Sequence, residues 1–280
     1  MDRANSLHAI GETRPWWSYD TVAETYDRLA VPHIFTQPAK DLVALLKLPR
    51  DARALDVGAG TGVAALLALQ SAGSGALVVS LDSSLGMLRV ARKKGLPWLV
   101  AGAVPRLPFR EAVFDGVLAN FVLSHVPSYQ TALLEMVRVL RSGGRLGFSA
   151  WGSAQSEFRA LWQATADLFV GKEELSRGLR QALPWEEWFS EAGHLQEALR
   201  EAGLERIEVD HREYGTSVSV DDFLSQREIT FQARLMNELL EPAKWESFRE
   251  NIMTEFHTRY GGLLEDTRDV YLAVGTKPHT

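Results

Sequence analysis

The 280-residue chain contains no cysteine and no long apolar run. Without cysteine there are no disulfides, no thiolate nucleophile and no cysteine-ligated zinc or iron–sulfur site. No apolar run approaches the roughly 20 residues that span a bilayer. The N-terminal segment Met1–Ser6 lacks the apolar stretch of a signal peptide. We therefore expect a cytoplasmic protein without membrane insertion.

An excess of positive charge is also missing. The chain has 30 Lys and Arg against 36 Asp and Glu, a net charge of −6, which argues against a nucleic-acid partner. No metal site is expected, because the histidines lie in separate segments without i, i+4 spacing. These histidines include His33, His194, His211 and His257. The 46% of hydrophobic residues suffice for one large domain, or for a core with a satellite.

The most informative segment is Ala54–Gly62, an apolar run that passes through Asp56 into the glycine-rich turn Gly58–Gly62. A second apolar run, Ala76–Leu81, stops at Asp82. A strand, a glycine turn, a helix and a second strand ending in a carboxylate form a nucleotide-binding half of an α/β fold. Glycine lets the backbone approach a ligand because it has no Cβ. Asp82 can accept hydrogen bonds from both ribose hydroxyls, so the pattern predicts an adenosine-type cofactor.

The glycine pattern alone leaves two cofactor classes open. Gly60–Ala65 also satisfies the dinucleotide form, in which alanine can replace the third glycine. Asp56, two residues before Gly58, suits a cofactor with a cationic amino-acid end rather than a pyrophosphate. A short-chain nicotinamide-dependent dehydrogenase carries a tyrosine four residues before a lysine, and no tyrosine of this chain has that spacing. The amino-acid type of cofactor is therefore favoured.

Five sequence blocks follow one another in order: Leu55–Gly62, Leu81–Leu88, Leu107–Phe109, Phe114–Leu118 and Val137–Leu146. Together they resemble the core of the class I S-adenosylmethionine-dependent methyltransferases, in the broad group that includes the quinone methyltransferases, over residues 53–148. The resemblance implies an α/β fold with a Rossmann-like, doubly wound, seven-stranded sheet, mostly parallel with an antiparallel last strand. It also implies helical lid insertions, S-adenosyl-L-methionine as cofactor and methyl transfer as the activity.

The resemblance places the cofactor at the ends of the first strands. Gly58, Gly60 and Gly62 would pass beneath its methionine and ribose parts. Asp82 would bind the ribose with Ser83 beside it, although Asp82 could instead cap the next helix, as could its two serine neighbours. Asp56 would reach the ammonium group, directly or through water.

Three more residues are expected to contact the cofactor. Met87 would lie against the adenine face, with core packing as the alternative, and Asn120 would meet the amino-acid end. The segment Trp17–Asp27 resembles the family's N-terminal lid, in which Tyr26 would close over the cofactor. Tyr19, seven residues earlier, would share one face of the same predicted helix. Simple helix packing is the alternative for these tyrosines.

One departure from the family pattern concerns adenine. The family usually places an acidic residue at the end of the third strand, where this chain has Ala103. Adenine would then be held by backbone groups around Ala103 and Val104. Losing one hydrogen bond costs about 0.5–1.5 kcal/mol. Two consequences of this departure stay open: the protein binds the cofactor more weakly than the family does, or it is a relative of the family that does not methylate.

No catalytic residue is assigned from the sequence. Positioning a nucleophile against a reactive methyl donor can supply ~7–11 kcal/mol of the barrier without one. His125 is the candidate base or substrate ligand, but packing under the sheet edge is the favoured interpretation, since the family often has histidine here without catalysing through it. The acidic pairs Glu186–Glu187 and Asp221–Asp222 are expected to be helix N-terminal charges.

The hydrophobic pattern predicts alternating strands and helices. Strands are expected near 53–57, 76–81, 97–101, 114–119 and 145–151, and helices near 62–71, 84–94, 128–141 and, weakly, just after Asn120. At the N-terminus we expect a helix over 21–28 that Pro32 ends and another that Pro38 opens. The predicted divisions are an N-terminal helical arm (1–36), a cofactor-binding core (37–151), a helical insertion (152–204) and the rest of the sheet (205–280). That last part would hold strands near 206–214 and 269–274 and a helical insertion at 220–258, broken at Pro242.

The methyl acceptor is expected to be a small, apolar or aromatic metabolite. Of eight tryptophans only Trp98 lies inside the core blocks, and aromatic lid elements suit a roomy apolar pocket. Packing of the insertion helices explains the tryptophans equally well. Two alternatives to methyl transfer stay open: a methyltransferase-fold protein that binds or converts its ligand without methylating it, and a nicotinamide-dependent dehydrogenase.

Overall fold

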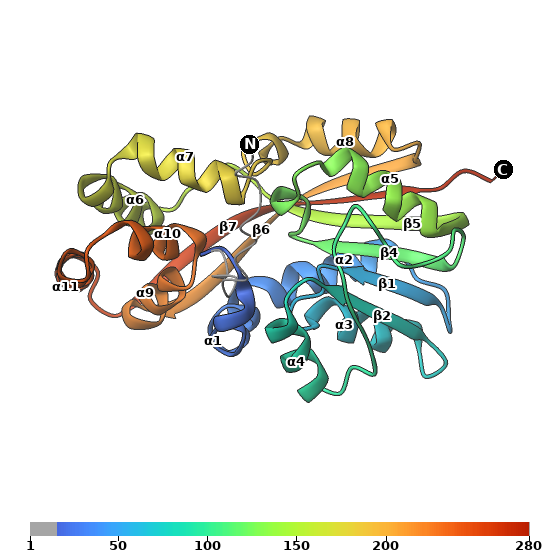
Figure 1. Ribbon diagram of the computed structural model, residues 1–280, viewed down its shortest axis with the longest axis horizontal. Helices are drawn as coiled ribbons and strands as arrows, with labels where there is room; N and C mark the ends of the chain where they lie inside the picture. The colour runs from blue at the N-terminus through green and yellow to red at the C-terminus, as the bar shows by residue number, and fades with distance from the viewer. Residues whose placement is uncertain (1–15, 280) are drawn as a thin grey trace, which may run out of the picture.

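A seven-stranded sheet forms the centre of the computed structural model, which describes residues 16–279, so that Met1–Ser6 and the rest of residues 1–15 lie outside the described residues. The strand order is β3-β2-β1-β4-β5-β7-β6 (Figure 1). The strands are β1 (Arg53–Val57), β2 (Leu77–Asp82), β3 (Trp98–Ala101), β4 (Phe114–Asn120), β5 (Leu140–Trp151), β6 (Glu205–Ser219) and β7 (Leu263–Thr276). The first five are parallel and β7 is antiparallel to both of its neighbours, which confirms the predicted fold class.

Helices cover both faces of this sheet. One face carries α2 (Thr36–Leu46), α3 (Val63–Ala72) and α4 (Leu85–Lys93), whose small and branched apolar residues pack on β1, β2 and β4. The other face carries α5 (Tyr129–Val139) and α8 (Ala192–Glu201). Strands buried on both faces explain the near-continuous apolar runs of the sequence. Ser84 and Ser128 begin α4 and α5 as N-caps, each accepting a hydrogen bond from a backbone N–H three residues on.

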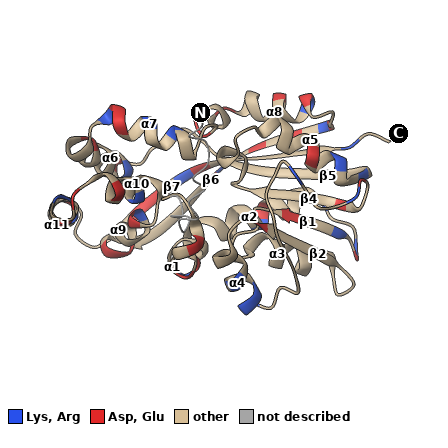
Figure 2. Cartoon of the chain, in the orientation of Figure 1, with Lys and Arg blue, Asp and Glu red and all other residues tan. Residues whose placement is uncertain are grey.

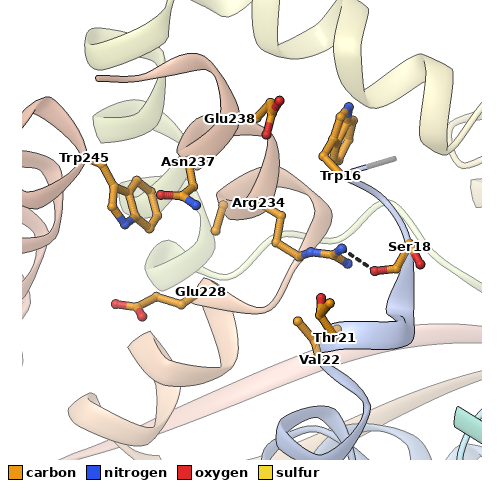
Figure 3. A pocket seen from close by; sticks show the side chains of 10 residues that line it. Trp16, Ser18, Thr21, Val22, Glu228, Arg234, Asn237, Glu238 and Trp245 are labelled. Atoms are coloured by element: carbon orange, nitrogen blue, oxygen red, sulfur yellow. Dashed lines mark hydrogen bonds between the residues drawn. The ribbon is translucent and has the colours of Figure 1, made fainter. Parts of the chain in front are cut away.

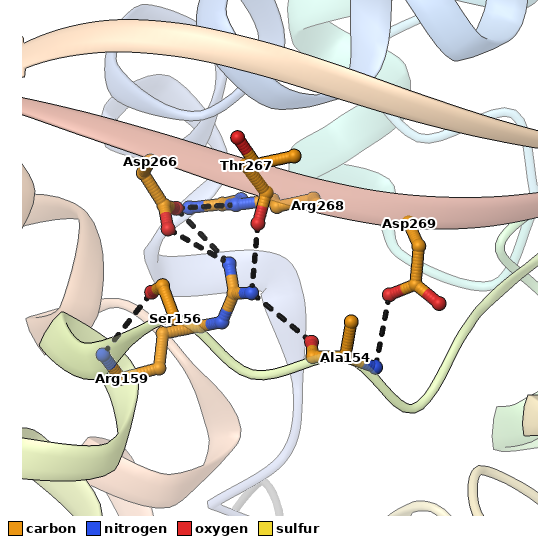
Figure 4. Close-up of polar contacts among 7 residues, drawn as sticks. All are labelled: Ala154, Ser156, Arg159, Asp266, Thr267, Arg268 and Asp269. Atoms are coloured by element: carbon orange, nitrogen blue, oxygen red, sulfur yellow. Dashed lines mark hydrogen bonds and ion pairs between the residues drawn. The ribbon is translucent and has the colours of Figure 1, made fainter.

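A second group of helices packs on the far end of the β6–β7 ribbon, at the left of Figure 1. It comprises α6 (Glu157–Val170), α7 (Lys172–Ala182), α9 (Val220–Glu228), α10 (Phe231–Leu239) and α11 (Pro242–Arg259). These five helices share a core of their own, which includes Trp162 and Phe248. We call this group the helical lobe. Arg159 of α6 pairs with Asp266 of β7 and so ties the lobe to the ribbon (Figure 4).

The N-terminal arm consists of three short helices that lie between the lobe and α4. They are the 3₁₀ helix η1 (Tyr19–Thr21), α1 (Ala23–Leu29) and the π-helical turn η2 (Val31–Phe35). The prediction that Pro32 ends the first helix is wrong, because α1 already ends at Leu29. Pro32 lies instead at the start of η2, where its missing N–H costs no helical hydrogen bond. Pro38 lies within the first turn of α2, which begins at Thr36.

Three predicted strands are too short. β5 begins at Leu140 rather than near residue 145, because Leu140 pairs with Phe114 across an irregularity in the ladder. The last two strands extend beyond their predicted ranges and pair with each other from Glu205 to Ser219. Buried Asp266 and its charged neighbours interrupt the apolar pattern of β7, so periodicity could not reveal this extension. The region after Asn120 is the 3₁₀ helix η3 (Leu123–His125).

Acidic and basic side chains are interspersed over the helices of both the sheet layers and the lobe (Figure 2). Within residues 16–279, no helix is both long and apolar enough to cross a membrane. The part of the chain that the structure describes holds no cluster of three His, Asp or Glu side chains that could bind a metal ion.

Candidate functional site at the carboxyl edge of the sheet

The turn after β1 supplies the first part of the site. Gly58, Gly60 and Gly62 all have positive φ, of 65°, 54° and 87°. A Cβ at Gly58 would lie 2.5 Å from Val122, and one at Gly62 would lie 2.2 Å from Leu96, so packing alone requires glycine at both positions. A Cβ at Gly60 would meet no atom within 4 Å. Gly60 is therefore the one of the three at which the space beside the backbone leaves room for a ligand.

Asp82 lies at the end of β2 beside this turn. Its Oδ2 accepts a hydrogen bond of 2.7 Å from the Gly60 N–H, and its Oδ1 accepts one of 2.7 Å from the Ser84 N–H. Each carboxylate oxygen has a second lone pair, so the group can still accept from a ligand. Burial raises the pKa of Asp82, and the Ser84 and Gly60 amides oppose the shift. The N-cap of α4 is Ser84, not Asp82, and Ser83 is exposed beside the carboxylate.

Asp56 is 1% exposed, and neither of its carboxylate oxygens has a hydrogen-bond partner of good geometry among the described residues. Burial and the charge of Asp82 raise its pKa well above the usual range, while the backbone amide of Ala65 in α3 opposes them. The neighbouring hydroxyls of Ser80 and Thr61 are likewise buried and unpartnered in the described chain. Such groups cost free energy unless a charge or polar atom meets them. An uncompensated carboxylate under the glycine turn fits a ligand with a cationic end.

Asn120 ends β4, next to β1 in the sheet, where the strand order reverses and ligands of open α/β sheets bind. Its Oδ1 accepts a 2.8 Å hydrogen bond from the Ser149 hydroxyl, which itself accepts one from the Phe121 N–H. Phe121 has φ 56°, a conformation that costs a bulky residue free energy and that clusters at functional sites. The Phe121 ring stacks on Trp151, with centroids 4.0 Å apart.

The segment after β3 reaches the same edge. The Gly102 N–H donates to the Asp82 carbonyl, which places Ala103 and Val104 beside the end of β2. Ala103 is exposed, whereas Val104 packs against the sheet core. No side-chain acid stands at this position, so only backbone groups and Val104 are available there for an adenine ring.

The N-terminal arm covers this edge. The prediction that Tyr19 and Tyr26 share one helix is wrong, because η1 ends at Thr21 and α1 begins at Ala23. Their rings nevertheless meet edge to face, with centroids 5.6 Å apart. Burial raises the pKa of both tyrosines, with Asp82 contributing to each shift. Met87 of α4 is buried against these two rings and Ala23. Met87 therefore packs under the arm, and its contact with an adenine face stays a prediction.

Asp20 fastens the arm to α4, which the sequence did not reveal. Its Oδ1 accepts hydrogen bonds of 2.7 Å from the Gly86 N–H and 2.8 Å from the Ser84 hydroxyl. A carboxylate at a helix N-terminus is favoured by the helix dipole. Lys94, the C-cap residue of α4, adds a 2.8 Å ion pair with Asp27 of α1. No local sequence pattern reveals this role of Asp20, since its partners lie more than 60 residues away in the sequence.

His125 lies in η3, where its ring centroid is 5.2 Å from that of Phe231 and 6.3 Å from that of Tyr19. Burial lowers the pKa of His125 to about 4, against the effect of its hydrogen bond with the Phe121 backbone. The imidazole is therefore uncharged at neutral pH. This packing among rings favours the interpretation that His125 is a packed histidine, although an uncharged imidazole can still accept a proton.

Glu186 is the acidic residue that sequence reasoning placed wrongly. It lies in a turn before η4 (Trp188–Ser190) rather than in a helical first turn, whereas Asp221 and Asp222 do begin α9 as predicted. Burial raises the pKa of Glu186 to about 7, although a hydrogen bond with Ser124 favours its charged form. Its charge also raises the pKa of Tyr19, so the two groups are near neighbours. The sequence feature that could have indicated this burial of Glu186 is the pair of tryptophans on either side of it, Trp185 and Trp188.

The Glu186→Gln variant is expected to gain stability relative to the parent protein as pH rises. Folding favours the protonated Glu186 carboxyl, so its stabilising contribution is complete below its ordinary pKa of 4.5 and is lost as pH rises to about 7. Above pH 7 the variant should be more stable by on the order of 1–3 kcal/mol. Thermal unfolding from pH 4.5 to 8 measures this difference. The exposed neighbour offers a control, Glu187→Gln, and equal pH profiles for both variants would contradict the expectation.

Comparison with known proteins decides the family. Residues 55–148 match the family model of the methyltransferase domain. Residues 55–148 thus form a methyltransferase domain. This confirms the resemblance drawn from the five sequence blocks, and the relatives place the domain near the quinone methyltransferases. The match ends at Phe148 in β5, so the arm, the helical lobe and β6–β7 lie outside it.

The curated relatives match about half of this chain. A demethylmenaquinone methyltransferase of Streptomyces avermitilis is 40% identical over 147 residues, which cover 52% of this chain and 52% of the relative. Another, from Mycolicibacterium vanbaalenii, is 44% identical over 134 residues, which cover 46% of this chain and 56% of the relative. The chain thus spans about half the length of the curated relatives that it matches.

A solved structure shares the whole fold. A phosphoethanolamine N-methyltransferase of Haemonchus contortus, in complex with S-adenosyl-L-methionine, has a TM-score of 0.55 at 18% identity. The alignment covers 93% of this chain and 57% of that one. At this level of identity the likeness concerns the fold alone, not the substrate.

Proposed function

We propose that this protein transfers a methyl group from S-adenosyl-L-methionine to a small aromatic acceptor. The observation that carries the proposal is the arrangement around Asp82. Its carboxylate bridges the Gly60 and Ser84 amides, with open space at Gly60 and an uncompensated carboxylate at Asp56. An adenosyl cofactor with an amino-acid end has complementary groups for all three features. Two solved structures of similar fold, one in complex with S-adenosyl-L-methionine and one with S-adenosylhomocysteine, support the proposal.

In this proposal each residue at the sheet edge has one task. Asp82, with Ser83 beside it, accepts hydrogen bonds from the ribose hydroxyls, and Gly60 lets the backbone approach the cofactor, with Gly58 and Gly62 shaping the turn. Asp56 and Asn120 face the amino-acid end, and Asp56 acts through the first turn of α3 or through water. Met87 and the backbone of Ala103 and Val104 border the adenine. The cofactor, when bound, supplies an electrophilic methyl group on a sulfonium.

The arm and the lobe supply the acceptor side. Tyr26 stacks on Phe35, and Tyr19 meets Phe231 and His125, so aromatic rings line the space over the end of β4. In this proposal these rings would exclude water and align a flat nucleophile, which is the main need of methyl transfer. The names of the curated relatives support a quinone-like acceptor. A cytoplasmic location and the division into arm, core and two insertions remain predictions from the sequence.

Calorimetric titration of the purified protein tests the cofactor assignment. We expect micromolar binding of S-adenosylhomocysteine and no binding of NADH or NADPH. Binding of a nicotinamide cofactor alone would overturn the proposal in favour of a dehydrogenase. Incubation with S-adenosylmethionine and 1,4-naphthohydroquinone, followed by mass spectrometry, then tests the acceptor class. Cofactor binding with no methylated product from any phenolic or quinol acceptor would favour the alternative of a non-methylating protein.

A further inference from the structure

A cavity of about 430 Å³ lies between the N-terminal arm and the helical lobe, away from the glycine turn (Figure 3). Trp16 and Val22 of the arm line one side, and Trp245 of α11 lines the other. The volume is in the range of small-molecule sites, roughly 300–1,000 Å³. Two indole rings on opposite sides offer flat apolar walls for a planar molecule.

Arg234 of α10 is the basic residue among those that line this cavity, beside the acidic Glu228 and Glu238. Its Nη2 donates to the Ser18 carbonyl, while its Nη1 is buried and has no hydrogen-bond partner among the described residues. Burial lowers the pKa of Arg234. A guanidinium keeps its charge in proteins, so the unused donor carries an uncompensated desolvation cost. An oxygen of a ligand would remove that cost.

The carboxylates of the cavity do not provide this partner. Glu228 is held by Arg249 in a 2.8 Å ion pair, and within residues 16–279 no ion pair joins Arg234 to an acid. The lining thus combines the apolar faces of the two indole rings with polar groups, among them Arg234 with its free donor and the second carboxylate, Glu238.

Arg234 also joins the cavity to the sheet-edge site. Its guanidinium carbon lies 5.9 Å from the ring centroids of both Tyr19 and Phe231. Tyr19 in turn contacts Tyr26 and His125 over the end of β4. A ligand in the cavity therefore lies one aromatic layer away from the space proposed for methyl transfer.

We propose that this cavity binds the distal part of the acceptor, a planar aromatic molecule with an anionic oxygen, and that Arg234 Nη1 donates a hydrogen bond to that oxygen. The proposal rests on the proposed function, because it assigns the acceptor side of the same enzyme. It makes Arg234 a residue that selects among acceptors and leaves the chemistry of the methyl group to the sheet edge.

Two fluorescent probes of similar shape test the cavity without catalysis. 1-Anilinonaphthalene-8-sulfonate carries a sulfonate, and N-phenyl-1-naphthylamine is its neutral counterpart. We expect Arg234→Gln to weaken binding of the anionic probe by about tenfold or more, the loss typical of one hydrogen bond to a charged group. Binding of the neutral probe should stay unchanged, which reports an intact cavity. Arg234→Lys keeps the charge and should restore part of the affinity.

Matched variants separate this role from others. Arg259→Gln removes an exposed charge elsewhere on the lobe and should change neither affinity. Asn237→Trp fills the cavity from an exposed lining position and should weaken both probes. Equal losses of the two probes in Arg234→Gln would point to an opened arm and would overturn the proposal, as would no loss at all. A parallel titration with S-adenosylhomocysteine tests the proposed function separately. Failure to bind S-adenosylhomocysteine rejects the proposed function, whereas the two fluorescent probes test only whether the cavity binds an anionic aromatic molecule through Arg234.

Discussion

Asp82→Ala is expected to weaken S-adenosylhomocysteine binding by about 100-fold or more. The substitution removes the proposed acceptor of two ribose hydroxyls, and each hydrogen bond to a charged group contributes about 1.5–3 kcal/mol. It also frees the Gly60 and Ser84 amides that the carboxylate now holds at 2.7 Å. Calorimetric titration of the variant and the parent protein measures the change directly.

Two further variants control this result. Asp115→Ala removes a carboxylate that likewise accepts from a backbone N–H, that of Arg53, and pairs with Arg141, but at the opposite edge of the sheet. It should leave binding unchanged within a factor of about two. Asp82→Asn keeps one acceptor oxygen, so its affinity for S-adenosylhomocysteine should lie between those of the parent protein and Asp82→Ala. Unchanged affinity in Asp82→Ala would remove the ribose site from this edge of the sheet.

Asp266→Ala is expected to lower the free energy of unfolding by about 3–5 kcal/mol, the cost of removing one partner from a buried ionic network. Asp266 is fully buried and accepts from Arg159 at 3.0 and 3.2 Å and from Arg268 at 3.1 Å (Figure 4). Arg227 lies close by, and burial together with the charges of Arg268 and Arg159 lowers its pKa to about 9. Without the carboxylate, three cations would face one another with no buried anion between them.

Urea unfolding, followed by circular dichroism and by tryptophan fluorescence, measures this loss. Glu265→Ala is the matched control, because Glu265 is the exposed neighbour on the same strand, and its effect should stay within about 0.5 kcal/mol. Asp266→Asn keeps hydrogen-bond acceptance without charge and should be intermediate. A loss below about 1 kcal/mol in Asp266→Ala would show that the arginines reach solvent or other partners.

The sequence was most informative where local pattern and tertiary role coincide. The run through Asp56 and the turn Gly58–Gly62 predicted β1 and its loop, since positive φ and close packing admit little besides glycine there. Asp82 was predicted from its place at the end of the second apolar run. The parallel strands then had to bring both to one edge of the sheet.

Prediction failed where the deciding contact is distant in the sequence. Tyr19 and Tyr26 have helical spacing, yet the chain breaks between η1 and α1, where Arg234 and Asp20 hold the first turn to α10 and α4. Glu186 looked like a helix-end charge because its burial comes from segments that no pattern places beside it.

The sequence by itself determined the alternation of the first five strands with helices and the acidic and glycine residues at the carboxyl ends of the first two strands, while the family resemblance implied the seven-stranded sheet. The alternation and these residues follow from short-range periodicity, glycine positions and carboxylates at strand ends. Only the tertiary structure decided that the helices before β6 and before β7 form one lobe, that the arm is fastened to α4, and that a cavity with Arg234 lies between arm and lobe. Those features depend on which side chains meet across more than 60 residues of chain, and a local pattern carries no information about such meetings.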